Sequence, residues 1–250
     1  MKVVVLASGS KGNVTYVEHN DTRILLDIGK SCNYVEKALT DIGVEPSSIN
    51  AILITHTHID HVEGMRVFYK RYKPKVYIMP KMYKYLNDCV DDDSYVYYEE
   101  EIMIGNIKVN IIKTSHDVEA SVGFLINDNL VYITDTGYIN QKYIPMLSNK
   151  TMYIMESNHD IEMLYTGGYP YHLKMRIASD VGHLSNIDSA KYLSNMIGIN
   201  TKRIVLAHLS KENNTKELAL ETLLNTLDSN STIEIVIAKQ DERTQVFEIW

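Results

Sequence analysis

The sequence predicts an α/β fold in which two sheets pack face to face and helices cover their outer sides. Three observations favour this fold class. Runs of β-branched and apolar residues bounded by Gly, Asn or Asp recur along all 250 residues, and helical patterns separate several of them. The expected order opens with three consecutive strands and then alternates strand and helix. A similar order returns in the second half, and a purely parallel, doubly wound sheet fits the opening strands less well.

The individual elements follow from the apolar runs and, for helices, from residues that start and stop a helical pattern. Ser31 or Cys32, for example, precedes a helical pattern that Gly43 ends. In chain order, strands are predicted at Lys2–Ala7, Asn13–Glu18, Arg23–Asp27, Ala51–Thr55, Lys75–Met79, Ile107–Lys113, Gly123–Asn127, Leu130–Thr134, Met152–Glu156, Arg203–Ala207, Thr232–Ile237 and Thr244–Ile249. Helices are predicted at Asn33–Ile42, Val62–Tyr72, Lys81–Asn87, Asn140–Leu147, Asp188–Ile197 and Lys216–Leu227. No repeat or linker interrupts this succession, so residues 1–250 are predicted to form a single domain.

The composition bounds the function classes. The formal net charge of -7 gives no general attraction for polyanions, so nucleic-acid binding would need a local basic patch. The stretches Tyr69–Lys75 and His172–Arg176, with Lys81 and Lys84, are basic, and tyrosines interleave with the lysines in a way that suits base stacking. The alternative interpretation is an ordinary solvated helix face.

The sequence also predicts the cellular compartment. No apolar run approaches the roughly 20 residues of a membrane span, and the short apolar start of the chain is typical of a strand. Cys32 and Cys89 form no disulfide or metal framework, which favours reduced, buried thiols. A cytoplasmic protein without a membrane partner is therefore expected.

The stretch "ILITHTHIDHVEG", residues 52–64, predicts a metal site. His56 follows a predicted strand, and in an extended segment His56, His58 and Asp60 share one face. His61 starts the next turn and can reach the same point. Imidazole and carboxylate groups suit zinc, manganese or iron, and the spacing suits two metals side by side. The alternative is a polar surface loop that happens to be rich in histidine.

Two complete metal sites need further ligands, and we expect them where later strands end. His116, Asp135 and His208 each follow a predicted strand, in "IIKTSHD", "VYITDTG" and "IVLAHLS". Each residue alone is more typical of a cap or a surface position. Their joint occurrence after separate strands favours a shared site on a rigid scaffold.

These motifs resemble those of the metallo-β-lactamase-fold hydrolases, through "THTHIDH", "SHD", "DTG" and "AHLS". The resemblance implies a four-layer αβ/βα sandwich with a dinuclear metal centre. It implies one metal on His56, His58 and His116, a second on Asp60, His61 and His208, and Asp135 bridging the two. It also implies a supporting role for Asp27 in "DIG", which could equally be an ordinary turn residue.

Two divalent metal ions, manganese or zinc with iron as a third candidate, would activate a water molecule and polarise the group under attack. Asp60 is predicted to hold a metal and to orient the attacking water. This machinery fits hydrolysis of phosphodiesters, thioesters or lactams equally well.

Other stretches narrow the substrate. "GHLSN…AKYL" followed by "RIVLAHLS" resembles the tRNA-3′-processing nucleases, which implies that Glu156 and His183 protonate the leaving oxygen. "LASGSKGN", "DTGY", "ESNHD", "YPYHLKMRI" and "GHLSN" resemble the bacterial YycJ/WalJ group, which implies 5′-to-3′ exonuclease action on DNA. The candidate substrate-binding residues are Ser10, Asn13, His159, Lys174 and Arg176.

Three other functions are weighed. A small-molecule phosphodiesterase that cleaves a cyclic phosphate would use the same metals and would need only a small pocket. A non-catalytic binding module is disfavoured by the intact set of metal ligands. A thioester or lactam hydrolase leaves Glu156 and His183 without a role. The oligomeric state is not indicated by the sequence.

Overall fold

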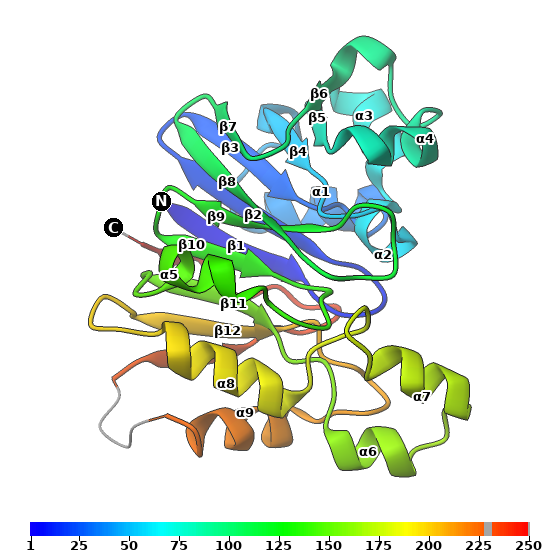
Figure 1. Cartoon of the computed structure of the whole chain (residues 1–250). Helices are drawn as coiled ribbons and strands as arrows, with labels where there is room; N and C mark the ends of the chain where they lie inside the picture. Colours follow the sequence, from blue (N-terminus) through cyan, green and yellow to red (C-terminus); the bar gives the residue numbers. More distant parts are fainter. Residues whose placement is uncertain (228–231, 250) are drawn as a thin grey trace. The chain divides into compact units, whose positions relative to one another are not determined.

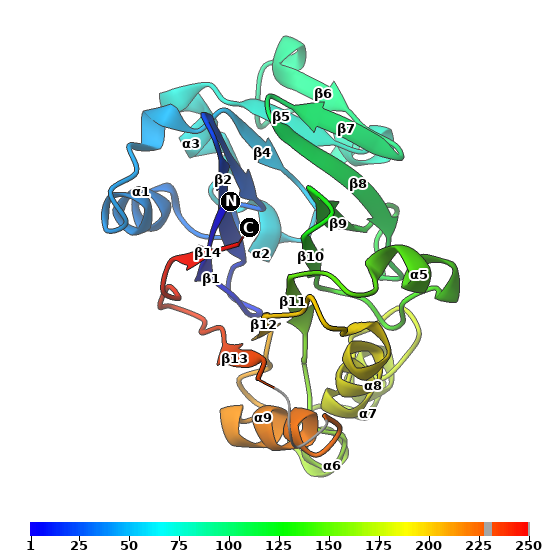
Figure 2. The same ribbon diagram turned by 90° about the vertical axis from the view of Figure 1, so that its left-hand side faces the viewer.

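The computed structural model describes residues 1–227 and 232–249. The chain divides into two compact units. The first comprises Met1–Ile111, Val118–Ser121 and Lys239–Trp250, and the second comprises Ile112–Asp117 and Val122–Ala238. Figures 1 and 2 show the elements of both. The assignment of residues 1–250 to a single domain stays a prediction.

The first unit contains a mixed seven-stranded sheet with the order β14-β1-β2-β3-β4-β5-β6. The strands are β1 (Lys2–Ala7), β2 (Val14–His19), β3 (Thr22–Leu26), β4 (Ala51–Leu53), β5 (Lys75–Ile78), β6 (Tyr95–Tyr97) and β14 (Phe247–Glu248). β14, β1, β2 and β3 pair antiparallel, whereas β3 to β6 run parallel. Leu26 lies opposite Leu53 in this register, so the residues that follow β3 and β4 emerge at one edge.

Helices and one hairpin complete the first unit. They are α1 (Cys32–Thr40), η1 (Pro46–Ser48), α2 (Ile59–Val62), α3 (Met65–Tyr72), η2 (Pro80–Met82), α4 (Tyr83–Leu86), η3 (Asp92–Ser94) and the hairpin of β7 (Glu101–Ile104) with β8 (Ile107–Lys113), whose last two residues belong to the second unit. The Ser31 hydroxyl caps α1 by accepting the Tyr34 N–H at 3.4 Å. Val35 and Leu39 bury the inner face of this helix.

The second unit contains five further strands in the order β13-β12-β11-β10-β9. They are β9 (Val122–Ile126), β10 (Leu130–Ile133), β11 (Met152–Glu156), β12 (Arg203–Ala207) and β13 (Glu234–Ile237). β9 and β10 form an antiparallel hairpin, and β10 to β13 run parallel. Ile133 pairs with Met155 and Glu156 with Ala207, so the ends of three neighbouring strands are level.

The helices of the second unit are η4 (Gln141–Tyr143), α5 (Ile144–Leu147), α6 (Ile161–Thr166), α7 (Tyr171–Ile177), α8 (Asn186–Met196) and α9 (Lys216–Leu224). α8 and α9 lie side by side (Figures 1 and 2). Their inner faces place Leu193 and Leu223 in a core with Tyr153 and Leu206 of the sheet. Ser185 and Thr215 cap the two helices.

All twelve predicted strands are present, most within two residues of their expected ends. The predicted strand Thr244–Ile249 is reduced to the two residues of β14. β6 and β7 were not predicted because they are short and lie among acidic and tyrosine residues. The predicted helix Val62–Tyr72 is interrupted at Gly64, where a Cβ would lie 2.2 Å from the carbonyl oxygen of Lys30.

α6 and α7 were also not predicted. α7 contains no buried residue, and its sequence YHLKMRI alternates apolar and polar residues, a pattern that indicates a strand and not a helix. Throughout the part of the chain that the structure describes, the helices are too short or too polar to cross a bilayer.

We predict that Leu193→Ala lowers the free energy of unfolding by about 2–5 kcal/mol, because Leu193 is fully buried in the core of the second unit. Leu224→Ala on α9 is the matched control, since that side chain is 52% exposed. Urea denaturation followed by circular dichroism measures both changes. Equal losses for the two variants would contradict the packing described here.

Candidate functional site

In the first unit the predicted metal-binding histidines lie between β4 and the end of α2. His56 and His61 are fully buried, whereas His58 and Asp60 are half-buried. The backbone is extended at His58, but Asp60 and His61 belong to α2. The structure therefore differs from the expectation that His56, His58 and Asp60 lie on one extended segment.

The three imidazole rings are close together. His56 Nε2 lies 3.2 Å from His58 Nδ1, and the ring centroids of His56 and His61 are 4.0 Å apart. Asp60 Oδ2 lies 3.5 Å from His61 Nε2. These nitrogen and carboxylate donors are the type that zinc and manganese accept, so the chemistry of the donor set fits a divalent metal.

Asp27 orients this group. It is fully buried and has a left-handed φ of 58° directly after β3. Its carboxylate accepts the Thr55 N–H at 2.8 Å, the Thr55 hydroxyl at 2.9 Å and His61 Nδ1 at 2.8 Å. Because Nδ1–H donates to Asp27, His61 presents the lone pair of Nε2. The supporting role implied for Asp27 therefore has a geometric basis.

The turn after β1 supports the same loop. The Asn13 N–H donates to the Asp60 carbonyl at 2.8 Å, and Asn13 Nδ2 lies 3.0 Å from His61 Nε2. A Cβ on Gly29 would lie 1.6 Å from the Asp60 carbonyl oxygen, so only glycine fits there. Asn13 is buried against the predicted metal ligands, whereas Ser10 is exposed on the same turn.

In the second unit, two predicted metal ligands follow strands of the same sheet, and both residues have a left-handed backbone conformation. Asp135 has a φ of 55° after β10, and His208 has a φ of 52° after β12. His208 Nδ1 lies 2.8 Å from Asp135 Oδ2. His116 Nδ1 lies 3.1 Å from the Gly182 carbonyl, and His116 Nε2 lies 3.9 Å from Asp135 Oδ1. Burial lowers the pKa of His116, which favours the neutral imidazole that binds metals.

Glu156, which is fully buried, and His183, whose side chain is 20% exposed, form a hydrogen-bonded pair in the same unit. Glu156 Oε1 lies 2.7 Å from His183 Nδ1, and Glu156 Oε2 accepts the N–H groups of Thr136 and Leu184 at 3.1 Å each. Burial lowers the pKa of His183, but the Glu156 and Asp135 carboxylates together raise it by a larger amount. The pKa of His183 therefore lies above its ordinary value.

One group in the second unit could hold an ion by itself. It consists of Asp135, Glu156, His183 and His208, whose donor atoms all lie within 4.8 Å of one another. The structure thus brings the predicted proton-donating pair next to two predicted metal ligands of this unit.

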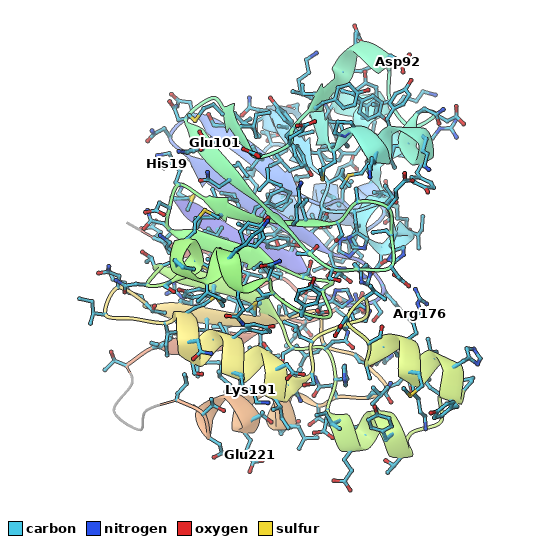
Figure 3. The ribbon with its side chains drawn as sticks, viewed as in Figure 1. His19, Asp92, Glu101, Arg176, Lys191 and Glu221 are labelled. Carbon is cyan, nitrogen blue, oxygen red and sulfur yellow. The ribbon has the colours of Figure 1, made fainter. Side chains whose placement is uncertain are left out.

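The predicted substrate-binding residues of the second unit have internal partners. Lys174 donates to the carbonyls of Tyr165 and Gly167 at 2.7 Å each, at the end of α6. Arg176, at the surface of α7 in Figure 3, forms an ion pair with Asp117. His159 is buried, which lowers its pKa to about 4, and its Nδ1 has no hydrogen-bond partner among the described residues.

Several cations of the basic stretches in the first unit also pair with carboxylates. Arg71 pairs with Glu36 and Lys73 with Asp91, both at 2.6 Å. Lys84 forms an ion pair with Glu119. Much of the charge expected to attract a polyanion is therefore matched by carboxylates.

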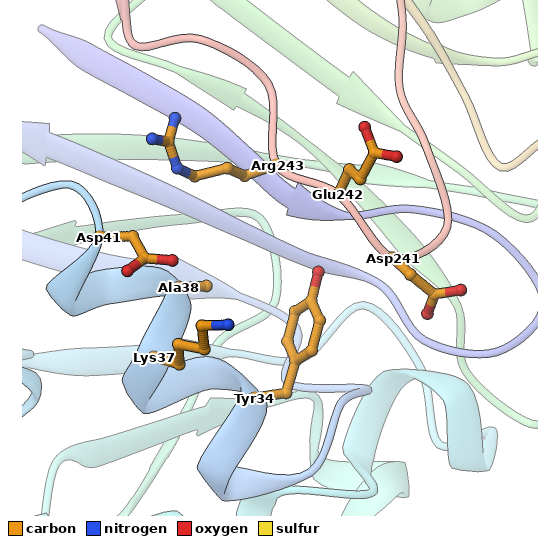
Figure 4. A pocket seen from close by; sticks show the side chains of 7 residues that line it. All are labelled: Tyr34, Lys37, Ala38, Asp41, Asp241, Glu242 and Arg243. Carbon is orange, nitrogen blue, oxygen red and sulfur yellow. The ribbon is translucent and has the colours of Figure 1, made fainter.

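A separate cavity of about 490 Å³ lies beside α1 in the first unit (Figure 4). It is lined by Tyr34, Lys37, Ala38, Asp41, Asp241, Glu242 and Arg243. Burial, together with the Asp241 and Glu242 carboxylates, raises the pKa of Tyr34 to about 12. No predicted site residue lines this cavity.

Some residues with a part in the site were not identified from the sequence. Thr55 looks like one more β-forming residue, yet it holds Asp27. Asp117 pairs with Arg176 and lies 3.5 Å from His116 Nε2. Its position directly after His116 in "SHD" was the available signal.

Comparisons with known proteins identify the fold and the family. Exodeoxyribonuclease WalJ of Streptococcus pneumoniae is 38% identical over 236 residues, covering 90% of this chain and 88% of that protein. Exodeoxyribonuclease YycJ of Bacillus anthracis is 35% identical over 232 residues, with the same shares covered. The family model described as "Anti-Pycsar protein Apyc1" matches residues 9–175. The solved structure of the metallo-β-lactamase fold protein YhfI from Bacillus subtilis has a TM-score of 0.75 at 15% identity, covering 98% of this chain and 100% of that chain.

These findings define a metal-dependent hydrolase with the metallo-β-lactamase fold, and the predicted fold class is confirmed. The chain belongs to the family that the Apyc1 model describes and to the YycJ/WalJ group.

We predict that Asp27→Asn weakens Mn²⁺ binding about 10–100-fold, because Asn would no longer fix the His61 tautomer. Isothermal titration calorimetry measures the affinity. Asp21→Asn is the control, because Asp21 is exposed in the turn between β2 and β3, and this variant should bind Mn²⁺ as the wild type does. An unchanged affinity in Asp27→Asn would remove Asp27 from the metal-binding machinery.

Proposed function

We propose that this protein is a divalent-metal-dependent exodeoxyribonuclease that degrades DNA from its 5′ end. The observation that carries the proposal is the partly buried Glu156–His183 pair beside Asp135 and His208, because a phosphodiesterase needs a proton donor for its leaving oxygen. The likeness to WalJ and YycJ, both named exodeoxyribonucleases, supports DNA as the substrate and partner.

We further propose that seven side chains hold two metal ions, manganese or zinc. They are His56, His58, Asp60, His61, His116, Asp135 and His208. Two findings support this assignment: every donor is an imidazole or a carboxylate, and the hydrogen bonds of His61 and His116 leave their Nε2 atoms free of the proton. Bound divalent ions supply an activated water and a polarised phosphate.

The side chains of the chain itself perform the remaining steps. Asp60 orients the attacking water, and Asp27 keeps His61 in the required tautomer. His183, hydrogen-bonded to Glu156, donates a proton to the oxygen that leaves when the P–O bond breaks. Glu156 stabilises the protonated imidazole before transfer and is itself held by two backbone N–H groups.

Among the proposed substrate contacts, Ser10 and Arg176 are the accessible ones. We assign Lys174 to the end of α6, and we assign Asn13 and His159 to support of the loops that carry the reactive residues. A cytoplasmic location is also proposed, supported by the free thiols of Cys32, which is buried, and Cys89, which is half-buried.

Replacing a proposed metal-binding residue should abolish turnover. We predict that Asp60→Ala and His58→Ala each lower kcat by more than about 100-fold, with the circular dichroism spectrum unchanged. A loss of about 100-fold is the most expected for a residue that only hydrogen-bonds to a metal ligand. Release of nucleotides from 5′-labelled single-stranded DNA, with manganese and with zinc, measures the rate. Wild-type-like cleavage by Asp60→Ala would contradict the assignment.

The substrate is tested by a matched panel of single-stranded DNA, double-stranded DNA, RNA, a cyclic nucleotide and bis-p-nitrophenyl phosphate. We expect metal-dependent release of mononucleotides from DNA. Hydrolysis of the cyclic nucleotide without cleavage of DNA would instead establish the small-molecule phosphodiesterase.

The proton-donor role predicts that the effect of His183→Ala depends on the leaving group. On DNA, kcat should fall about 10²–10⁴-fold, because the leaving alkoxide needs the proton. On bis-p-nitrophenyl phosphate, whose leaving group is stable as an anion, the loss should be much smaller. His172→Ala, at an exposed histidine of α7, is the control. An equal loss on both substrates would rule out proton donation.

A further inference from the structure

Four buried polar side chains in the second unit form what we call the amide cluster: Ser157, Asn158, Asn186 and Asn214. Their exposed fractions are 1%, 4%, 2% and 6%. They come from three segments of the chain: the loop after β11, the start of α8 and the residue before the cap of α9. None of them was a candidate site residue in the sequence.

Hydrogen bonds connect the cluster internally. Asn186 and Asn214 form a reciprocal pair in which each Nδ2 donates to the other Oδ1 at 2.9 Å. The Ser157 hydroxyl donates to Asn186 Oδ1 at 2.6 Å. Asn214 Nδ2 also donates to the carbonyls of Ser157 and Asn158, at 2.9 and 3.0 Å. Because both amides are almost fully paired, removal of one leaves buried hydrogen-bonding partners unsatisfied.

The cluster is attached to the segments that carry three reactive side chains. Ser157 directly follows Glu156, and its N–H donates to the Ala207 carbonyl at 2.9 Å. The Asn158 N–H donates to the carbonyl of Leu184, next to His183, at 3.0 Å. Asn158 Nδ2 donates to the carbonyl of His208 itself at 3.0 Å. Glu156 therefore precedes a member of the cluster in the chain, and His208 accepts a hydrogen bond from another. His183 precedes Leu184, which is itself hydrogen-bonded to the cluster.

The bond to His208 has a particular consequence. His208 has a left-handed φ of 52°, a conformation that is unfavourable for a residue with a side chain. The Asn158 amide holds the carbonyl of this residue in place. Reactive groups have to be held within about 0.5 Å of their working geometry, and a fully paired buried polar network is rigid enough to do so.

We propose that the amide cluster is a positioning device that sets the geometry of Glu156, His183 and His208 for the reaction. Its members touch neither the substrate nor the reacting atoms. The proposal rests on the proposed function for its kinetic consequences, but its structural consequence is independent of any activity.

The chain offers a matched control. Asn213 lies next to Asn214 and is equally buried, at 2% exposed, but its Nδ2 has no hydrogen-bond partner among the described residues. Asn213→Ala therefore removes a buried amide of the same kind without breaking a hydrogen bond of the cluster. Asn158→Ala and Asn214→Ala break it at two different points.

The first measurement uses the metal-free, full-length protein. The proton between His183 Nδ1 and Glu156 Oε1 should give a downfield proton NMR signal because the bond is short and partly buried. We expect this signal in the wild type and in Asn213→Ala, and its loss or shift in Asn158→Ala and Asn214→Ala. The same signal in all four proteins would overturn the proposal, whatever the protein hydrolyses.

The second measurement is kinetic, on DNA and on bis-p-nitrophenyl phosphate. For both cluster variants we expect kcat to fall at least about tenfold with KM within about twofold, and Asn213→Ala to match the wild type. A drop in all three variants that follows their melting temperatures would assign the cluster to stability alone and overturn the proposal. If Asn214→Ala does not fold, Ser157→Ala, which breaks a single side-chain bond, replaces it.

Failure of the proposed function gives a different result. A wild type that cleaves only the nitrophenyl diester refutes DNA as substrate, while the order of the variants on that diester still tests the cluster. A wild type without any activity leaves the NMR comparison as the deciding measurement.

Discussion

Carboxylates withdrawn from water have to accept hydrogen bonds from their surroundings, because an unpaired buried charge costs several kilocalories per mole. Asp27, Asp135 and Glu156 are at most 2% exposed, and all three stand at or just beyond the end of a strand. Asp27 takes its donors from the loop after β4, and Glu156 takes N–H groups from the loops after β10 and before α8. Within each unit, the need to pair these charges therefore fixes neighbouring loops to one another.

Much of this arrangement could be predicted from the sequence. Parallel strands end level with their neighbours, so polar residues directly after apolar runs had to gather at the strand ends, as Asp135 and His208 do. The apolar runs themselves were long enough to place the strands. What could not be predicted depends on side chains that meet only in three dimensions. Asn186 and Asn214 are 28 residues apart, and nothing in their local sequence indicates that they pair.

The partners of the basic residues could not be predicted from the sequence either. Clusters of lysine, arginine and tyrosine suggest a surface for nucleic acid, but a sequence does not reveal which carboxylates lie opposite them. Arg71 faces Glu36, Arg176 faces Asp117, and Lys174 is directed to the carbonyls that end α6. These three cations are engaged within the protein, so they do not add to a positive surface for a substrate.

The left-handed residues have a consequence for protein engineering. Asp27, Asp135 and His208 all adopt the conformation that glycine adopts most easily, so replacing them with glycine would relax the backbone at the expense of the chemistry. Lys73, at the end of α3, adopts it as well, and its side chain forms a solvent-exposed ion pair with Asp91 and lies over the Tyr69 ring. A search for more heat-resistant versions should begin at such peripheral positions, because the side chains of the other three residues belong to the proposed site.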